Sequence, residues 1–250
     1  MRTVVIAGGT RGIGGALADR LRQDGDRVIA LGSADADLTS VRQTIDLTTR
    51  LPPRIDTLVL AAGRFDQRRV VTGEGFEQTF AIGVLARYLL PSLLRPALEA
   101  SPAPMVLNLC GTGGIKARHL HWDDLQLTRG YRMFTATMQA ARANDLLGAG
   151  FPDRYPGIRY VLYNPLLVDS GMHRYLRQPG RTLVGAAARL FGQSPATAAE
   201  PLAALIHNPP AAPLTALRRG TPVPLTGPNF DPATAARLYT ELETLTAALR

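Results

Sequence analysis

Short apolar runs alternate with longer amphipathic stretches along most of the chain. The apolar runs predict strands over Thr3 to Ala7, Arg27 to Leu31, Ile55 to Ala61, Met105 to Leu109 and Ile158 to Tyr163. Apolar residues with a helical period predict helices over Gly14 to Arg22, Thr39 to Leu51, Phe76 to Leu98, Tyr131 to Leu147 and Pro195 to Ile206. Strands that alternate with helices favour an α/β fold with a doubly wound parallel sheet, formed by a single domain over 1–250.

Three features modify this pattern towards its end. Pro91 and Pro96 should kink or divide the long helix. Asp231 and Pro232 can cap and open a last helix that runs to about Leu249. The stretches 171–193 and 207–228 break the alternation, and late segments of such folds lie over the carboxyl ends of the strands, where ligands bind. We therefore interpret 171–193 as a substrate lid.

Composition narrows the class of protein. The chain has 250 residues, 46% of them hydrophobic, but no apolar run of the roughly 18 residues that a membrane span needs. The first strand begins at Thr3, which leaves no room for a signal peptide, so we expect a cytoplasmic protein without membrane association. Cys110 is the single cysteine, which excludes an internal disulfide and a thiolate metal cluster, and we expect no metal. The net charge of +8 comes from arginines without long runs, so nucleic-acid binding is not favoured.

A glycine-rich segment follows the first predicted strand and precedes the first predicted helix. It reads Gly8-Gly9-Thr10-Arg11-Gly12-Ile13-Gly14. Gly8 allows a tight turn, Gly12 allows the backbone to approach a pyrophosphate, and Gly14 permits close packing of the helix on the sheet. The start of the helix supplies N–H donors and the positive end of its dipole. The segment therefore predicts a dinucleotide-binding loop.

This spacing resembles the cofactor loop of the short-chain dehydrogenase/reductase family, and further stretches resemble that family in the same order over nearly the whole chain. Asn108 through Trp122-Asp123-Asp124-Leu125-Gln126 to Asn144, and the helix after Asp231, are similar to its retinol-dehydrogenase-like branch. Asp37-Leu38 resembles the pair that contacts adenine, with Asp46-Leu47 as the other register. The resemblance implies a Rossmann fold whose cofactor contacts come from Gly8, Thr10, Arg11, Gly12, Ile13, Gly14, Ser33, Asp37, Leu38, Ala61, Ala62, Gly63, Pro165, Val168 and Ser170.

The end of the second strand bears on which dinucleotide is bound. Members that prefer NAD(H) place an acid there, whereas this chain has Leu31-Gly32-Ser33. A carboxylate would repel the 2′-phosphate of NADP(H), and Arg11 is positioned in the sequence to attract it. The sequence therefore predicts NADP(H) as the cofactor.

The family's four reactive side chains are missing. Where the family has Asn, Ser, Tyr and Lys, alignment on Asn144 places Gly83, Gly111, Thr137 and Ala141. Lys116 is the only lysine, and Thr112 lies four residues before it, so no Tyr and Lys pair with this spacing exists. Since a positioned general acid or base contributes roughly 10²–10⁴-fold, ordinary carbonyl reduction should be feeble.

Other side chains near these positions are candidates for new chemistry. Cys110 follows the predicted strand before Gly111, with His119 and His121 near it in the sequence as groups that could lower its pKa. Tyr131 offers a phenol, although Thr135 stands four residues later where a lysine is needed, and Asp123 lies on the same stretch. Each of these also fits a packing or surface role.

Three hypotheses remain open. The first is a repurposed biosynthetic enzyme that holds the dinucleotide as part of its pocket wall and catalyses a cyclisation, dehydration or isomerisation of a small apolar or polyketide-like substrate. The second is a non-catalytic partner of an active homologue, associated through small residues of the predicted helix at Tyr131 to Leu147; the resemblance itself implies a homodimer or homotetramer. The third is an oxidoreductase that uses substitute residues such as Tyr131.

Overall fold

The computed structural model describes residues 1–114, 120–171, 176 and 178–249. Its seven strands form a single sheet in the order β2-β1-β3-β4-β5-β6-β7. β1 to β6 run parallel, and β7 pairs antiparallel with β6. The strands are β1 (Thr3–Ala7), β2 (Arg27–Leu31), β3 (Thr57–Leu60), β4 (Met105–Leu109), β5 (Arg159–Asn164), β6 (Leu214–Arg218) and β7 (Thr221–Pro222).

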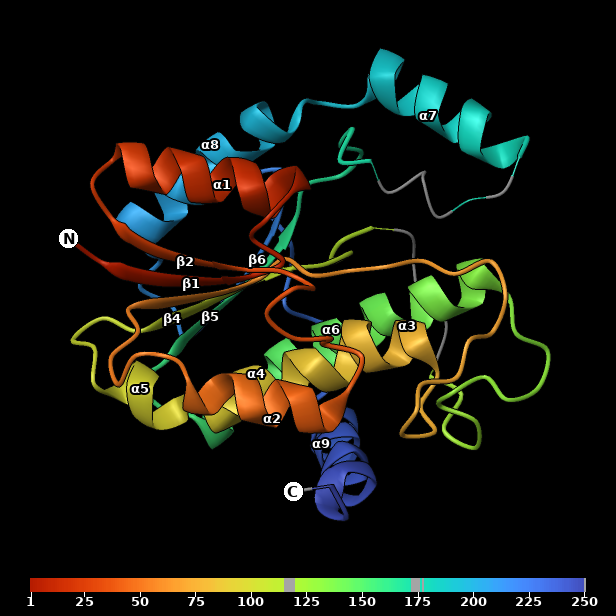
Figure 1. The fold of residues 1–250 in the computed structure, drawn as a ribbon. Helices are drawn as coiled ribbons and strands as arrows, with labels where there is room; N and C mark the ends of the chain where they lie inside the picture. Colours follow the sequence, from red (N-terminus) through yellow and green to blue (C-terminus); the bar gives the residue numbers. More distant parts are fainter. Residues whose placement is uncertain (115–119, 172–175, 177, 250) are drawn as a thin grey trace.

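Helices cover both faces of the sheet (Figure 1). α1 and α8 lie on one face, with α7 extending beyond them, whereas α2, α4, α5 and α6 lie on the other, with α9 outside α6. The helices are α1 (Gly12–Gln23), α2 (Val41–Thr49), α3 (Gln78–Phe80), the π-helical η1 (Ala81–Leu85), α4 (Ala86–Leu93), α5 (Arg95–Glu99), α6 (Met133–Arg154), α7 (Gly180–Phe191), α8 (Pro195–His207), the 3-10 turn η3 (Pro228–Phe230) and α9 (Pro232–Ala247). None of the helices in the described part of the chain has both the length and the apolar character of a membrane span.

The central strands are buried on both sides. Every residue of β3 and β4 is buried, and Leu58, Val59, Val106 and Leu107 are fully enclosed. A parallel sheet covered by helices on both faces requires this, which explains why the strands read as continuous apolar runs. The predicted α/β fold with a doubly wound parallel sheet is confirmed.

The structure confirms that the long predicted helix is divided, although Pro91 lies within α4, and it adds elements in the late segments. The predicted helix over Phe76 to Leu98 is divided into α3, η1, α4 and α5, and the break before α5 falls at Leu94, two residues before Pro96. The segment 207–228 contains β6 and β7, and 171–193 contains α7. The cap of α9 is confirmed, because the Asp231 carboxylate accepts from the Thr234 N–H at 2.7 Å.

The sheet is short on the side of β2. The usual order in dinucleotide-binding folds is 3-2-1-4-5-6, with a further strand outside the second. Here no strand in the described residues pairs with the outer edge of β2. The chain passes from Leu31 through residues 32–40 directly into α2.

α9 packs against α6 and reaches α4 through an aromatic contact. Leu238 and Leu242 are fully buried. The Tyr239 ring meets Tyr88 of α4 edge-on at 5.6 Å, and its hydroxyl donates to the Leu147 carbonyl of α6 at 2.9 Å. This part of α4 and α6 is therefore packed against the chain's own last helix.

Candidate functional site

The glycine loop between β1 and α1 has the geometry that its sequence predicted. Gly8 (φ +87°) and Gly12 (φ +57°) adopt left-handed conformations that favour glycine. A Cβ on Gly14 would lie 2.2 Å from the Gly8 carbonyl oxygen, so only glycine lets the start of α1 pack this closely on the turn.

Segments that lie far apart in the sequence meet at this loop. A Cβ on Gly8 would be 2.5 Å from the Ala62 nitrogen, which places the Ala61-Ala62-Gly63 stretch directly beside it. A Cβ on Gly12 would be 3.3 Å from the Cβ of Ser170, and one on Gly32 would be 2.6 Å from Oγ1 of Thr10. The fold thus brings together residues from the ends of β1, β2, β3 and β5 that were predicted to contact the cofactor.

The start of α1 is suited to bind an anion. Its N-cap residue, Arg11, makes no side-chain capping hydrogen bond, and its first turn contains no acidic residue. In contrast, Ser40, Ser194 and Asp231 cap α2, α8 and α9. Because the first N–H groups of a helix have no partner within the helix, those of α1, around Gly12 and Ile13, can donate to pyrophosphate oxygens. The loop therefore fits a dinucleotide.

An acid lies at the end of β2, contrary to the sequence interpretation. Gly32 to Asp35 form a turn in which the Asp35 carboxylate accepts from the Gly32 N–H at 2.7 Å. Ser33 is exposed within this turn. The argument for NADP(H) assumed that no carboxylate was present there, and this premise is wrong because the turn folds Asp35 back onto the strand end.

The Asp37-Leu38 pair follows the same turn. The Asp37 carboxylate accepts from both the N–H and the hydroxyl of Thr39, at 2.9 and 2.8 Å. Leu38 packs against the core, while Asp37 is exposed. Asp46 of the alternative register lies within α2. The loop position of Asp37 makes it the better candidate for a contact with the base.

The stretch Pro165 to Ser170 is held at both ends. The Asn164 side chain donates to the Thr112 carbonyl at 2.8 Å and accepts from the Leu166 N–H at 2.9 Å. Gln193, at the end of the lid segment, donates to the Pro165 carbonyl at 2.7 Å, and Val168 forms a bridge with Gln193. Opposite, a Cβ on Gly63 would meet nothing within 4 Å, so this side of the site is open.

Leu166 adopts a conformation that favours glycine, with φ at +60°. Leu166→Gly is expected to raise the free energy of unfolding by about 0.5–1 kcal/mol, because relief of left-handed strain exceeds the entropy that glycine adds to the unfolded chain. Urea unfolding measures this change. Leu167→Gly is the control, because Leu167 is also exposed but lacks a positive φ, and it should lower the free energy of unfolding. If both variants change the free energy of unfolding equally, Leu166 is not strained.

The positions aligned with the family's reactive residues lie close together but carry no reactive group. A Cβ on Gly111 would lie 3.0 Å from the Cβ of Ala141, and one on Gly83 would lie 3.4 Å from the Cβ of Ala140. The Thr137 hydroxyl donates to the Met133 carbonyl of its own helix at 2.8 Å. α6 therefore packs closely against the end of β4 and against η1.

The proposed Cys110 nucleophile lies in an unfavourable environment. Burial, together with the charge of Asp145, raises the pKa of Cys110 to about 12, although Arg87 opposes the shift. His121 is exposed, and His119 lies outside the described residues. Asp123 is also exposed and pairs with Arg129 at 3.0 Å on the surface. These placements favour a thiol at neutral pH and a surface role for His121 and Asp123.

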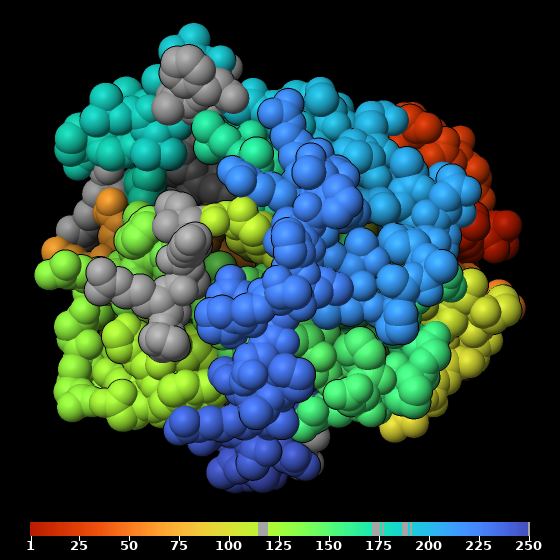
Figure 2. All heavy atoms as spheres, turned by 180° about the vertical axis from the view of Figure 1, so that it is seen from behind, coloured from red at the N-terminus to blue at the C-terminus, as the bar shows by residue number. Residues whose placement is uncertain are grey.

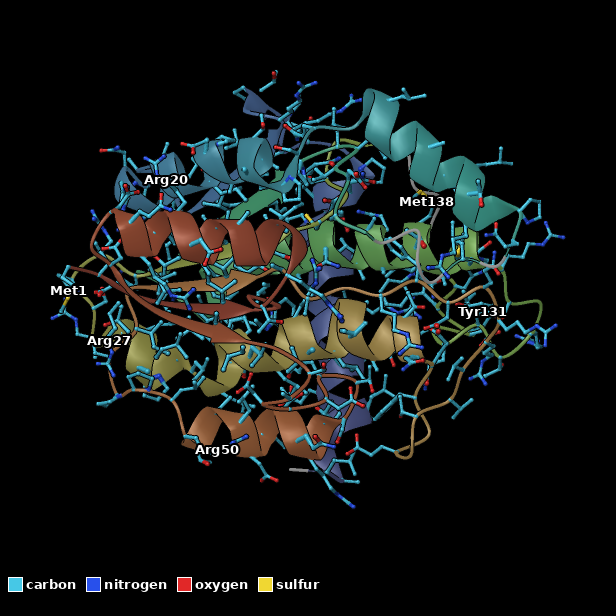
Figure 3. All side chains as sticks on the ribbon, turned by 45° about the horizontal axis from the view of Figure 1, so that its top comes forward. Met1, Arg20, Arg27, Arg50, Tyr131 and Met138 are labelled. Carbon is cyan, nitrogen blue, oxygen red and sulfur yellow. The ribbon has the colours of Figure 1, made fainter. Side chains whose placement is uncertain are left out.

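Tyr131 lies at the same end of the molecule as Met138 and α7, opposite Met1 and Arg27 (Figure 3). Its hydroxyl donates to the Asp66 carbonyl at 2.9 Å and is 3.3 Å from the Thr79 hydroxyl. Burial and the negative charges of Glu77 and Asp66 raise the pKa of Tyr131, although the bond to Thr79 opposes the shift. A catalytic phenol needs the opposite shift.

Arg87 of α4 is a component of the site that the sequence interpretation missed. Its guanidinium donates to the Ala62 carbonyl at 3.0 Å and to the Leu109 carbonyl at 2.6 Å, and it also contacts Asn108. It thereby links the ends of β3 and β4 beside the open side of the site. The sequence feature that could have identified Arg87 is that it is a single charged residue within an otherwise apolar helical run.

A groove of about 600 Å³ opens at the carboxyl ends of β5 and β6. Its lining combines apolar residues with two arginines: Leu166, Pro222, Val223, Arg218 and Arg219. In the space-filling view the surface is also hollowed beside α7 (Figure 2). α7 exposes Leu183, Val184 and Leu190, so the described part of the predicted lid segment presents an apolar surface.

Comparisons with known proteins identify several relatives. The "Putative daunorubicin C-13 ketoreductase DnrU" of Streptomyces sp. (strain C5) is 30% identical over 190 residues, covering 66% of this chain and 65% of that protein. Dehydrogenase/reductase SDR family member 12 of Bos taurus is 28% identical over 245 residues, covering 92% and 74%. Retinol dehydrogenase 13 of Homo sapiens is 25% identical over 233 residues, covering 80% and 70%. No model of a protein family matches the chain.

Solved structures share the fold. The 3-alpha-hydroxysteroid dehydrogenase from Pseudomonas sp. B-0831, complexed with NADH, superposes with a TM-score of 0.69 at 20% identity, covering 87% of this chain and 96% of that one. An uncharacterised protein from Mycobacterium paratuberculosis gives a TM-score of 0.72 at 21% identity, covering 99% and 94%.

Proposed function

Because the chain belongs to the short-chain dehydrogenase/reductase family, we propose that it binds NAD(P)(H) at its glycine loop and catalyses a non-redox step on a small molecule. The step would be a cyclisation, dehydration or isomerisation. The dinucleotide would serve as a fixed part of the pocket wall. In relatives, a bound dinucleotide supplies hydride transfer. This chain lacks the usual proton donor for that reaction.

The close contact between Gly111 and Ala141 carries this proposal. A serine side chain at position 111 would meet the Cβ of Ala141 at 3.0 Å, and a lysine at 141 would extend from the same crowded point. Position 111 therefore leaves little room for a side chain beside α6. A complete dinucleotide-binding loop beside such a site favours a protein that binds the dinucleotide over one that transfers hydride with it.

The third hypothesis, an oxidoreductase that uses Tyr131, has less support. The Tyr131 phenol is held by a backbone carbonyl, and its pKa is raised. At neutral pH it remains protonated, and no cation among the described residues lowers its pKa. A proton transfer through this group would therefore be slow.

The lining of the groove at β5 and β6 suits a small substrate that has both apolar surface and oxygen atoms. Leu166 and Val223 supply apolar surface, while Arg218 and Arg219 can donate to carbonyl or carboxylate oxygens. Orienting such a substrate contributes several kcal/mol to an intramolecular ring closure without a strong acid or base. The lid segment, held to Pro165 by Gln193, would close over this groove.

The test combines nucleotide content with turnover. The purified protein is denatured and any released nucleotide is identified by absorbance and mass, and a panel of polyketide-like ketones is then incubated with NADPH, NADP⁺, NADH or NAD⁺. We expect an isomeric or dehydrated product at equal rates with the oxidised and reduced forms. Stoichiometric consumption of NADPH or NADH would overturn the non-redox proposal.

Asp35 gives a prediction about cofactor preference. Asp35→Asn is expected to tighten NADPH binding roughly 10-fold relative to NADH, because it removes a negative charge from the end of β2, where the 2′-phosphate would lie. Competitive titration with both nucleotides measures the ratio. Asp46→Asn, on α2, serves as the control. If the ratio is unchanged in Asp35→Asn, the Asp35 carboxylate does not oppose the 2′-phosphate. The prediction that Arg11 favours NADP(H) would then stand.

The packing of α9 limits the second hypothesis. A non-catalytic partner was expected to associate through small residues of the helix that is here α6, and α9 occupies part of the surface of that helix, around Leu147 and Gly150. A partner subunit would therefore have to use the part of α6 that α9 leaves uncovered.

A further inference from the structure

A cavity of about 600 Å³ lies apart from the glycine loop, between α6 and the segment that leads into α9. We call it the Trp122 cavity. Leu120, Trp122, Leu225 and Phe230 form its apolar walls, and Arg142 and Asp231 are its charged lining residues. In the space-filling view, the segment of residues 225–234 borders the residues that follow 119 (Figure 2). Its lining includes no residue that was predicted to contact the dinucleotide.

Arg142 is the unusual component of this cavity. Its side chain belongs to α6, the residue is only 3% exposed, and its Nη1 has no hydrogen-bond partner among the described residues. A buried guanidinium that lacks an acceptor loses free energy relative to one in water. An acceptor oxygen supplied by a ligand in the cavity would satisfy it.

Each neighbouring carboxylate accepts a hydrogen bond from another residue, although the Oδ1 atom of Asp145 is buried without a partner among the described residues. Asp231 caps α9 through the Thr234 N–H, and the Oδ2 atom of Asp145 accepts from Asn229 at 3.3 Å. Both acids oppose the effect of burial, which lowers the pKa of Arg142. Their two negative charges would repel a dianion such as a phosphate monoester, whereas a single carboxylate matches the charge and the planar shape of a guanidinium.

We propose that the Trp122 cavity binds a small molecule with an apolar body and one carboxylate, and that Arg142 holds the carboxylate. The apolar body would pack against Trp122, Leu225 and Phe230. The volume lies within the range of roughly 300–1,000 Å³ that is usual for small-molecule sites. Octanoate is a suitable probe, because it combines a short alkyl chain with one carboxylate.

Trp122 makes this site directly measurable. It is the only tryptophan of the chain, and its ring lines the cavity with the Arg237 guanidinium 4.2 Å from the ring centroid. Tryptophan emission of the nucleotide-free protein therefore reports a ligand that binds beside Trp122. We expect octanoate to change the emission saturably, with a dissociation constant below about 1 mM, and 1-octanol to bind at least 10-fold more weakly.

Two variants test the role of the guanidinium. Arg142→Gln should weaken octanoate binding at least 10-fold and leave 1-octanol binding unchanged, with its fold checked by circular dichroism. Leu225→Glu, at a lining residue that is 40% exposed, places a negative charge at the cavity without altering the core, and should weaken octanoate at least 5-fold. Arg132→Gln, at the exposed start of α6, is the matched control and should change nothing.

The outcomes separate this site from the dinucleotide site. Octyl phosphate should bind more weakly than octanoate, since the two acids disfavour a dianion. The proposal is overturned if octanoate gives no saturable change in emission, if 1-octanol binds equally well, or if octanoate binds Leu225→Glu and the wild type alike. The titrations use protein freed of nucleotide, so these results do not depend on the dinucleotide site.

Discussion

Replacing Leu238 and Leu242 together by alanine is expected to remove most of the free energy of folding. Both side chains are fully buried where α9 packs across α4 and α6. A buried leucine truncated to alanine costs about 2–5 kcal/mol, and the two together approach the total of about 5–15 kcal/mol that holds a domain folded. Thermal unfolding followed by circular dichroism measures the loss.

The control for this pair lies on the same helix. Glu243 is exposed beside Leu242, so Glu243→Ala should change the free energy of unfolding by less than about 0.5 kcal/mol. Gel filtration adds a second readout, because a loosened α9 would expose the apolar surface of α4 and α6. A double variant that stays as stable as the wild type would show that α9 is not needed to cover these helices.

Gly14→Ala is expected to abolish tight dinucleotide binding. The added Cβ would lie 2.2 Å from the Gly8 carbonyl oxygen, so α1 or the glycine turn must move. Any shift takes the first N–H groups of α1 away from the pyrophosphate, and overpacking costs about 1–3 kcal/mol of stability. We expect binding to weaken roughly 10²-fold, equivalent to about 2.7 kcal/mol.

Calorimetric titration with NADH and NADPH measures this effect. Gly73→Ala is the matched control, because a Cβ at that position would meet nothing within 4 Å and the residue does not have a positive φ. It should bind both nucleotides as the wild type does. Equal binding by Gly14→Ala would mean that the loop does not hold the pyrophosphate in the way its geometry indicates.

Local sequence signals predicted the parts of the site that depend on a few adjacent residues. The turn at Gly8 and the cap at Asp231 each follow from short-range backbone requirements, and the helix predicted from Gly14 begins two residues earlier, at Gly12. The strands were predictable because each is a buried apolar run, and their meeting point follows from the parallel topology.

Residues whose position depends on the folded chain were not predictable in this way. Asp35 reaches the end of β2 only through a turn, so its carboxylate seemed in the sequence to lie beyond that strand. Arg87 links two strand ends that are more than 40 residues apart in the chain, Ala62 and Leu109. The placement of α9 over α4 and α6 is a long-range packing choice that no local pattern encodes.

The open edge at β2 has a consequence for how long a nucleotide remains bound. Because no strand among the described residues lies outside β2, the adenosine half of a dinucleotide would rest on residues 32–40 and meet bulk solvent on its outer side. Less of its surface would be buried, and escape would begin from this half. Rapid exchange of the nucleotide is therefore the expected behaviour, and isolation in dilute buffer would tend to strip it from the protein.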